Sequence, residues 1–237
     1  MQYFFSYLPH RPQQFIAMAE KIIPFLILTT ITFFLIAGIE AISSPPDYLQ
    51  GHLVKIMFIH VPSAYLASLC YGGLAIFCFI FLVWRSPMCN IMARAIAPVG
   101  LLFTLICLIT GSLWGKPAWG TFWVWDARLT SVFILFLLYV GQMLLAKEIS
   151  DYRPAAMVAV VGAVNLPIIK FSVTWWQTLH QGSSLLKIDG PSIAPTILSP
   201  LLWSIAGFTS LALLFFLWRA NGLLYQKLFN NIYQNKK

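Results

Sequence analysis

The chain has 237 residues, of which 59% are hydrophobic, 16% aromatic and only 9% charged. A mean hydropathy of +0.80 excludes a soluble globular domain and predicts a protein that uses lipid as its solvent. The net charge of +8 requires no nucleic acid partner, because basic loops on one side of a membrane suit an anionic lipid surface.

Six apolar runs, each long enough to cross a bilayer as a helix, follow one another along the chain. The predicted spans are 22–42, 56–84, 95–113, 129–146, 155–171 and 196–218. Asn165 and Pro167 predict a local kink in the fifth span. The expected fold class is an all-α integral membrane protein, a bundle of six transmembrane helices that forms one domain over residues 1–237.

The positive charges predict how this bundle is oriented. Ten lysines and arginines with three acids lie in the tails and even-numbered loops, and five with four acids lie in the odd-numbered loops. The net charges of the two sides are therefore +7 and +1. Because short loops rich in Lys and Arg stay in the cytoplasm, both termini are expected there, with loops one, three and five outside.

The third loop, together with its flanks, is the most unusual part of the sequence, and we call residues 114–130 the tryptophan segment. It places four tryptophans and a phenylalanine close together: Trp114, Trp119, Phe122, Trp123 and Trp125. An aromatic belt at the membrane interface is one explanation, but it accounts for only one or two tryptophans at each span end. The density on a single connection favours a binding platform.

A helical tryptophan segment would place Trp119, Trp123 and Asp126 on one face. This surface suits a large, flat, amphipathic ligand, with its macrocycle on the aromatic rings and its carboxylates near Lys116 or Arg128. Haem has this shape. Arg128 has an alternative role, since it could instead pair with Asp126 at the boundary of the span.

Three of the four histidines lie in the predicted outer segments. His60 falls in the first turns of the second span and His180 just beyond the fifth, so both are expected at one membrane depth. A haem iron takes axial ligands from above and below, and neutral imidazole is a common one. The sequence therefore predicts a bis-histidine site, with hydrogen-bonded interfacial anchors as the alternative role. His52 and His10 are expected to be solvated.

The run Trp-Gly-x-x-x-Trp-Gly-x-x-Trp-x-Trp-Asp-x-Arg-Leu-Thr, at residues 114–130, resembles the WWD signature of haem-handling membrane proteins. Within that superfamily the chain is similar, over essentially its whole length, to the CcmC family (cytochrome c maturation protein C, haem exporter protein C). The flanking His60 and His180 match as well. Phe122 departs from the pattern, because some relatives carry another tryptophan there, which would add an indole N–H.

The resemblance implies noncovalent, transient binding of haem b at the periplasmic face of the bacterial inner membrane, and delivery to the haem chaperone CcmE for c-type cytochrome biogenesis. It implies a transfer or export protein rather than an enzyme. It also implies the ATP-binding cassette subunits CcmA and CcmB and the small membrane protein CcmD as partners, and axial ligation of the iron by both histidines. The site residues expected are His60, His180, Trp114, Trp119, Phe122, Trp123, Trp125, Asp126 and Arg128.

Three other functions remain as alternatives. A pore-forming haem exporter subunit would need polar residues along a route through the spans, and Thr104, Thr110 and Gln142 are too sparse to define one. A transmembrane electron carrier would place paired histidines at both membrane depths, whereas the candidates here cluster outside. The third alternative is a scaffold subunit with an aromatic belt and no cofactor. The sequence contains no P-loop, so energy for haem release is expected to come from a partner.

Overall fold

The computed structural model describes residues 12–180 and 193–234. Within these ranges the chain is helical, apart from connections and an isolated antiparallel bridge between Asp47 and Gly51. The helices are α1 (Pro12–Ser43), the 3-10 helix η2 (His52–Ile56), α2 (Met57–Trp84), α3 (Pro87–Trp119), α4 (Ala127–Glu148), α5 (Arg153–Gly162), α6 (Asn165–Trp175) and α7 (Pro195–Gln234).

Six stretches of these helices are long and apolar enough to cross a membrane, with η2 joined to α2 and α5 joined to α6. The predicted number of spans is therefore confirmed, but most of the predicted spans are shorter than the helices of the structure. The helix α1 begins at Pro12, α3 begins at Pro87 and α7 continues to Gln234. The physical reason is that an apolar run records only the hydrocarbon core, whereas helical hydrogen bonding continues through the interfacial layers.

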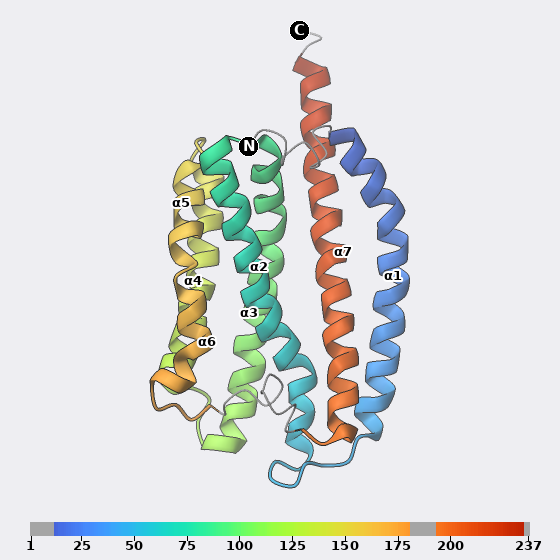
Figure 1. Cartoon of the computed structure of the whole chain (residues 1–237), viewed down its shortest axis with the longest axis vertical. Helices are drawn as coiled ribbons and strands as arrows, with labels where there is room; N and C mark the ends of the chain where they lie inside the picture. Colours follow the sequence, from blue (N-terminus) through green and yellow to red (C-terminus); the bar gives the residue numbers. More distant parts are fainter. Residues whose placement is uncertain (1–11, 181–192, 235–237) are drawn as a thin grey trace.

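Two helix pairs organise the bundle (Figure 1). The helices α2 and α3 pack along each other in the centre, and α1 packs along α7 on one side of them. The helices α4, α5 and α6 cover the other side. The start of α1 and the end of α7 lie at one end of the molecule, and the connections 44–51, 120–126 and 176–180 lie at the other (Figure 1).

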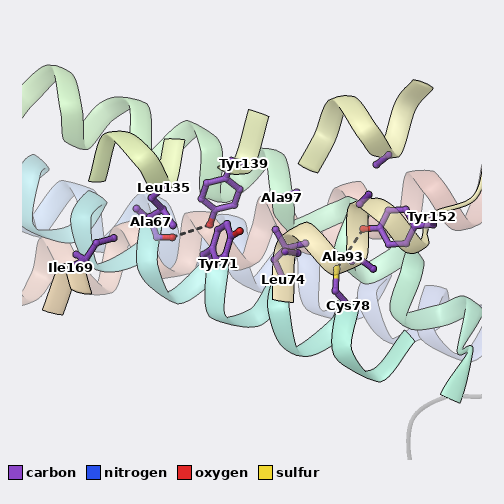
Figure 2. Close-up of a cluster of buried hydrophobic side chains, with 14 residues drawn as sticks. Ala67, Tyr71, Leu74, Cys78, Ala93, Ala97, Leu135, Tyr139, Tyr152 and Ile169 are labelled. Atoms are coloured by element: carbon purple, nitrogen blue, oxygen red, sulfur yellow. Dashed lines mark hydrogen bonds between the residues drawn. The ribbon is translucent and has the colours of Figure 1, made fainter. Parts of the chain in front are cut away.

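The largest buried cluster lies where α2, α3, α4 and α5 meet (Figure 2). The rings of Tyr71 and Tyr139 pack edge to face with centroids 4.9 Å apart, and the Tyr139 hydroxyl donates to the Ala67 carbonyl at 2.9 Å. A Cβ atom at Gly100 would lie 1.9 Å from the Tyr139 hydroxyl oxygen, and one at Gly162 would lie 2.2 Å from that of Tyr71. Glycine at both positions lets these helices approach closely in lipid.

The fifth span is interrupted between α5 and α6, as the prediction of a kink there requires. The side-chain amide of Asn165 donates to the backbone carbonyl of Ser131 on α4 at 2.8 Å. This bond ties the interruption to a neighbouring helix. The backbone amides of Ala163, Val164 and Leu166 donate to carbonyls three residues earlier, which keeps them satisfied within the bundle. The helix α6 that follows leads directly into the segment that carries His180.

Candidate functional site at the loop end of the bundle

His60 and His180 come from distant parts of the sequence and meet at the loop end of the bundle. His60 is the fourth residue of α2 and is 8% exposed, whereas His180 follows α6 and is half-buried. The centroids of their imidazole rings lie 6.3 Å apart, and the ring planes differ by 27°. The structure thus brings together the two histidines that the sequence predicts as a pair.

The separation of the two rings suits a single metal ion between them. Metal–nitrogen bonds of about 2.0–2.1 Å, with ~1.1 Å from each centroid to its nitrogen, place two imidazole centroids about 6.2 Å apart across one ion. No group of three or more His, Cys, Asp or Glu side chains suited to a metal occurs among the described residues. A two-ligand site therefore fits an ion that brings its other ligands with it, as iron does in haem.

The His60 ring lies directly against α3. Its Nδ1 atom is 3.1 Å from the Thr110 hydroxyl oxygen. A Cβ atom at Gly111 would lie 3.0 Å from the Cε1 atom of the ring, so glycine is needed for this close approach. The indole of Trp114 packs edge to face with the same imidazole, with centroids 5.7 Å apart. Two consecutive turns of α3 therefore hold the ring in place.

The tryptophan segment is not one helix, so the condition under which Trp119, Trp123 and Asp126 would share a helical face is not met. The helix α3 ends at Trp119, because Gly120 adopts a left-handed conformation with φ +80°. Residues 120–126 then run without helical structure until Asp126 caps α4 by accepting from the Leu129 amide at 2.7 Å. Because Gly120 ends one helix and Asp126 begins the next, helical spacing does not apply to the residues between them.

The aromatic side chains of the segment divide into two groups. Trp114 lies against His60, and the ring of Trp119 lies 6.1 Å from that of His180 at an angle of 60°. These two tryptophans flank the histidine pair. A Cβ atom at Gly115 would lie 3.0 Å from the Trp119 ring, so this glycine allows the indole to fold back against α3.

The second group lies around Phe133 of α4. Trp123 and Trp125 contact each other with centroids 5.4 Å apart, and each also contacts the ring of Phe133. Trp125 is 74% exposed and Phe122 is 54% exposed, with the Lys116 amine 5.3 Å from the centre of the Phe122 ring. Among the described ring contacts, none joins these side chains to either histidine.

Three polar side chains of the segment have buried atoms without a hydrogen-bond partner. They are the Trp123 indole nitrogen, the Asp126 Oδ2 atom and the Arg128 Nε atom. The guanidinium of Arg128 interacts electrostatically with His60, and no ion pair joins it to Asp126. Arg128 also interacts electrostatically with Asp126, so the alternative in which these two residues pair keeps its support. The buried Nε atom of Arg128 has no hydrogen-bond partner among the described residues, which suits an anionic group on a ligand.

Several residues that shape the site were not predicted from the sequence. The Gln50 side chain accepts from the Trp114 indole at 2.8 Å, which fastens the first loop to α3. Thr110 contacts His60, and Gly111 and Gly115 make room for His60 and Trp119. The Gly-x-x-x-Gly spacing of these glycines is a recognisable signal of close packing in membranes, whereas Gln50 and Thr110 carry no such signal.

The remaining histidines and the cysteines are not part of the histidine pair. His52 is exposed, and all four cysteines are buried and free. His10 lies outside the described residues. The donor set of the site fits haem: two facing imidazoles provide axial nitrogens, Trp114 and Trp119 provide flat apolar walls, and the buried Nε atom of Arg128 is available to a carboxylate.

Comparison with known proteins places this geometry in a family. The family model described as "CcmC: Heme exporter protein C" matches residues 5–233. The chain is 48% identical to "Heme exporter protein C" of Bradyrhizobium diazoefficiens over 204 residues, covering 84% of this chain and 78% of that protein. It is 44% identical to "Heme exporter protein C" of Escherichia coli K12 over 207 residues, covering 85% and 83%.

A plant relative is also similar. The chain is 41% identical over 191 residues to the "Putative cytochrome c biosynthesis ccmC-like mitochondrial protein" of Arabidopsis thaliana, covering 81% of this chain and 72% of that protein. The family model extends across the spans and the tryptophan segment alike. This multi-pass membrane chain therefore belongs to the CcmC family, that of heme exporter protein C, whose named members act in transport and cytochrome c biogenesis.

Proposed function

We propose that this protein binds haem b noncovalently at the periplasmic face of the bacterial inner membrane and delivers it to the haem chaperone CcmE for c-type cytochrome biogenesis. The observation that supports this most directly is the meeting of His60 and His180 at 6.3 Å, flanked by Trp114 and Trp119. Two imidazoles between aromatic walls are a poor arrangement for a structural anchor alone. They suit an iron porphyrin held from both faces.

Each group of the site has a defined task in this proposal. His60 and His180 hold the iron through one ring nitrogen each, and Trp114 and Trp119 cover apolar porphyrin edges. Arg128 binds a propionate carboxylate, because its Nε atom is buried and has no hydrogen-bond partner among the described residues. Haem is the cargo, and it contributes the iron and its four pyrrole ligands.

Release of the cargo is favoured by the unequal burial of the two ligands. His60 is held on a helix, whereas His180 lies in a connection after α6 and is half-buried. The exposed rings of Phe122 and Trp125 extend the aromatic surface of the tryptophan segment toward a partner. We infer that CcmE takes haem from this side, and that CcmA, CcmB and CcmD complete the complex and supply energy from ATP.

The orientation of the bundle follows from its charges. The tails and even-numbered loops of the sequence carry a net charge of +7, against +1 for the odd-numbered loops. The start of α1 and the end of α7 lie opposite the connections 44–51, 120–126 and 176–180 (Figure 1). Because basic short loops remain cytoplasmic, the histidine pair faces the periplasm. The site then lies on the side where c-type cytochromes are assembled.

The alternative of a pore through this chain alone finds little support in its buried polar side chains. The Thr104 hydroxyl donates to the Gly100 carbonyl within α3, and the Gln142 amide donates to the Tyr152 hydroxyl. Thr110 faces His60. Apart from the Gln142 Oε1 atom, which is buried without a partner among the described residues, these groups bond to neighbours, and the three side chains do not form a continuous polar route.

The test compares three alanine variants purified in detergent from haem-replete cells: His60→Ala, His180→Ala and the matched control His52→Ala. His52 lies at the same end of the bundle but is exposed. The measurements are haem content by pyridine haemochrome assay and the absorption spectrum. We expect the wild type and His52→Ala to show a low-spin bis-histidine spectrum, and the other two variants to lose it.

Two results would contradict the proposal. Wild-type protein that stays free of haem after haem is added would leave an aromatic-belt scaffold as the better account. Equal spectra for all three variants and the wild type would show that haem binds elsewhere on the protein.

A further inference from the structure

The hydrogen bonds around Thr110 define which nitrogen of His60 carries the proton. The Thr110 hydroxyl lies 2.7 Å from the Ile106 carbonyl oxygen and 3.1 Å from the Nδ1 atom of His60. A hydroxyl has one proton to donate and can accept through its lone pairs. A carbonyl oxygen can only accept, so the threonine proton goes to Ile106 and its oxygen faces Nδ1 as an acceptor.

His60 must therefore donate through Nδ1. The opposite tautomer would require the threonine to abandon Ile106 and would leave an N–H at Nε2 that needs another acceptor in an apolar setting. The ring also interacts with the backbone carbonyl of Cys107 on α3, which likewise can only accept. Both groups that α3 presents to the ring thus favour a nitrogen that donates.

We propose that Thr110 is the positioning residue of the haem site, holding His60 in the Nδ1–H tautomer so that the Nε2 lone pair is free to ligate iron. This inference rests on the proposed function and adds to it the residue that prepares the ligand. Metal-bound histidines generally donate their second ring N–H to a fixed acceptor, which sets the tautomer and the ring orientation. Here the acceptor is the Thr110 hydroxyl on the neighbouring helix α3.

The immediate surroundings of the ring restrict its rotation. Gly111 lies against Cε1, and Trp114 packs against the ring edge to face. With Thr110 these neighbours hold the imidazole from α3. A ring that is fixed before haem arrives loses less conformational freedom on ligation, so the hydroxyl contributes to haem affinity without touching haem.

The experiment uses the full-length protein in detergent and haemin as the probe. Thr110→Val removes the hydroxyl at nearly constant volume, and Thr110→Ser keeps it. Thr104→Val is the matched control, because Thr104 is buried in the same helix and makes only the bond to the Gly100 carbonyl. His60→Ala reports whether His60 binds haem at all. Haemin affinity is measured by absorbance titration and the ligand field by low-spin electron paramagnetic resonance.

We expect Thr110→Val to weaken haemin binding by between about 10-fold and 100-fold and to shift the low-spin signal. Thr110→Ser and Thr104→Val should stay within about twofold of the wild type. A second measurement needs no haem: nitrogen-15 NMR of histidine-labelled protein in bilayers should show Nδ1–H for His60, assigned by its loss in His60→Ala.

The outcomes separate this inference from the function on which it rests. If His60→Ala loses haemin binding but Thr110→Val keeps wild-type affinity and signal, Thr110 does not position the ligand, and the haem site stands. If Thr104→Val is as impaired as Thr110→Val, the effect is general packing and the inference fails. If His60→Ala binds haemin as the wild type does, the proposed site itself is wrong.

Discussion

At the scale of single residues, the Asp126 and Arg128 side chains of the tryptophan segment have two separate roles. Asp126 accepts from the Leu129 amide and so begins α4, while its second carboxylate oxygen is buried without a partner. Arg128 has a buried Nε atom without a partner and interacts electrostatically with His60. The first residue defines where the helix starts, and the second presents a cation to the site.

Replacement of Asp126 tests its role as a cap. We expect Asp126→Ala to lower the free energy of unfolding by about 1 kcal/mol, because an alanine leaves an amide of the first turn without an acceptor. Asp126→Asn should cost less, since asparagine caps helices about as well as aspartate. The measurement is SDS-induced unfolding followed by tryptophan fluorescence. Equal losses for both variants would assign the effect to the charge and contradict the capping role.

Replacement of Arg128 tests its contact with the haem carboxylates. We expect Arg128→Met to weaken haemin binding about tenfold, because a charge-assisted hydrogen bond is lost. The same variant should bind haemin dimethyl ester as well as the wild type does, since the ester has no carboxylate to pair. Lys116→Met is the control, because Lys116 is exposed and donates to the Gly120 carbonyl. A tenfold loss for the ester as well would contradict a carboxylate contact.

At the scale of elements, α3 is the helix that builds the site. Thr110, Gly111, Trp114, Gly115 and Trp119 lie on its last turns, and each contacts a histidine or makes room for a side chain of the site. The helix runs past the apolar core and ends at Trp119, where Gly120 is left-handed, rather than at residue 113 as predicted. The interruption between α5 and α6 is the second feature that builds the site, because α6 leads to His180.

Glycine to alanine exchange tests the close packing of α3. We expect Gly111→Ala to displace the His60 ring by a few tenths of an ångström and to weaken haemin binding several-fold, because the new Cβ would lie 3.0 Å from Cε1. Gly141→Ala in α4 is the matched control, since its Cβ would meet no atom within 4 Å. Absorbance titration of both variants with haemin measures the difference. Wild-type affinity for Gly111→Ala would show that the ring tolerates the methyl group.

At the scale of the whole molecule, the start of α1 and the end of α7 lie opposite the end that holds the histidine pair, as an even number of spans requires (Figure 1). In the proposed orientation these two ends of the bundle lie on different sides of the membrane. Haem bound between His60 and His180 would then be accessible from one compartment only. The expected compartment is the periplasm, by the distribution of Lys and Arg.

Cysteine labelling in intact cells tests this orientation. The native cysteines give little background, because all four are buried. We expect Tyr48→Cys, at a position that is 96% exposed in the loop before η2, to react with a membrane-impermeant maleimide. Lys147→Cys, where the lysine side chain is 79% exposed at the opposite end, should react only after the cells are lysed. The reverse pattern would overturn the proposed topology.

The sequence by itself determined the six spans, because the length of an apolar run is a local property and a run long enough to cross the hydrocarbon core is stable in it. It also singled out the tryptophan segment and the two histidines by residue type. Only the tertiary structure decided that His60 and His180 meet, that Trp114 and Trp119 flank them, and that Thr110 faces the ring. These contacts join residues distant in sequence, and helix packing fixes them. The helical spacing considered for residues 119–128 does not apply, because Gly120 and Asp126 end and begin helices there.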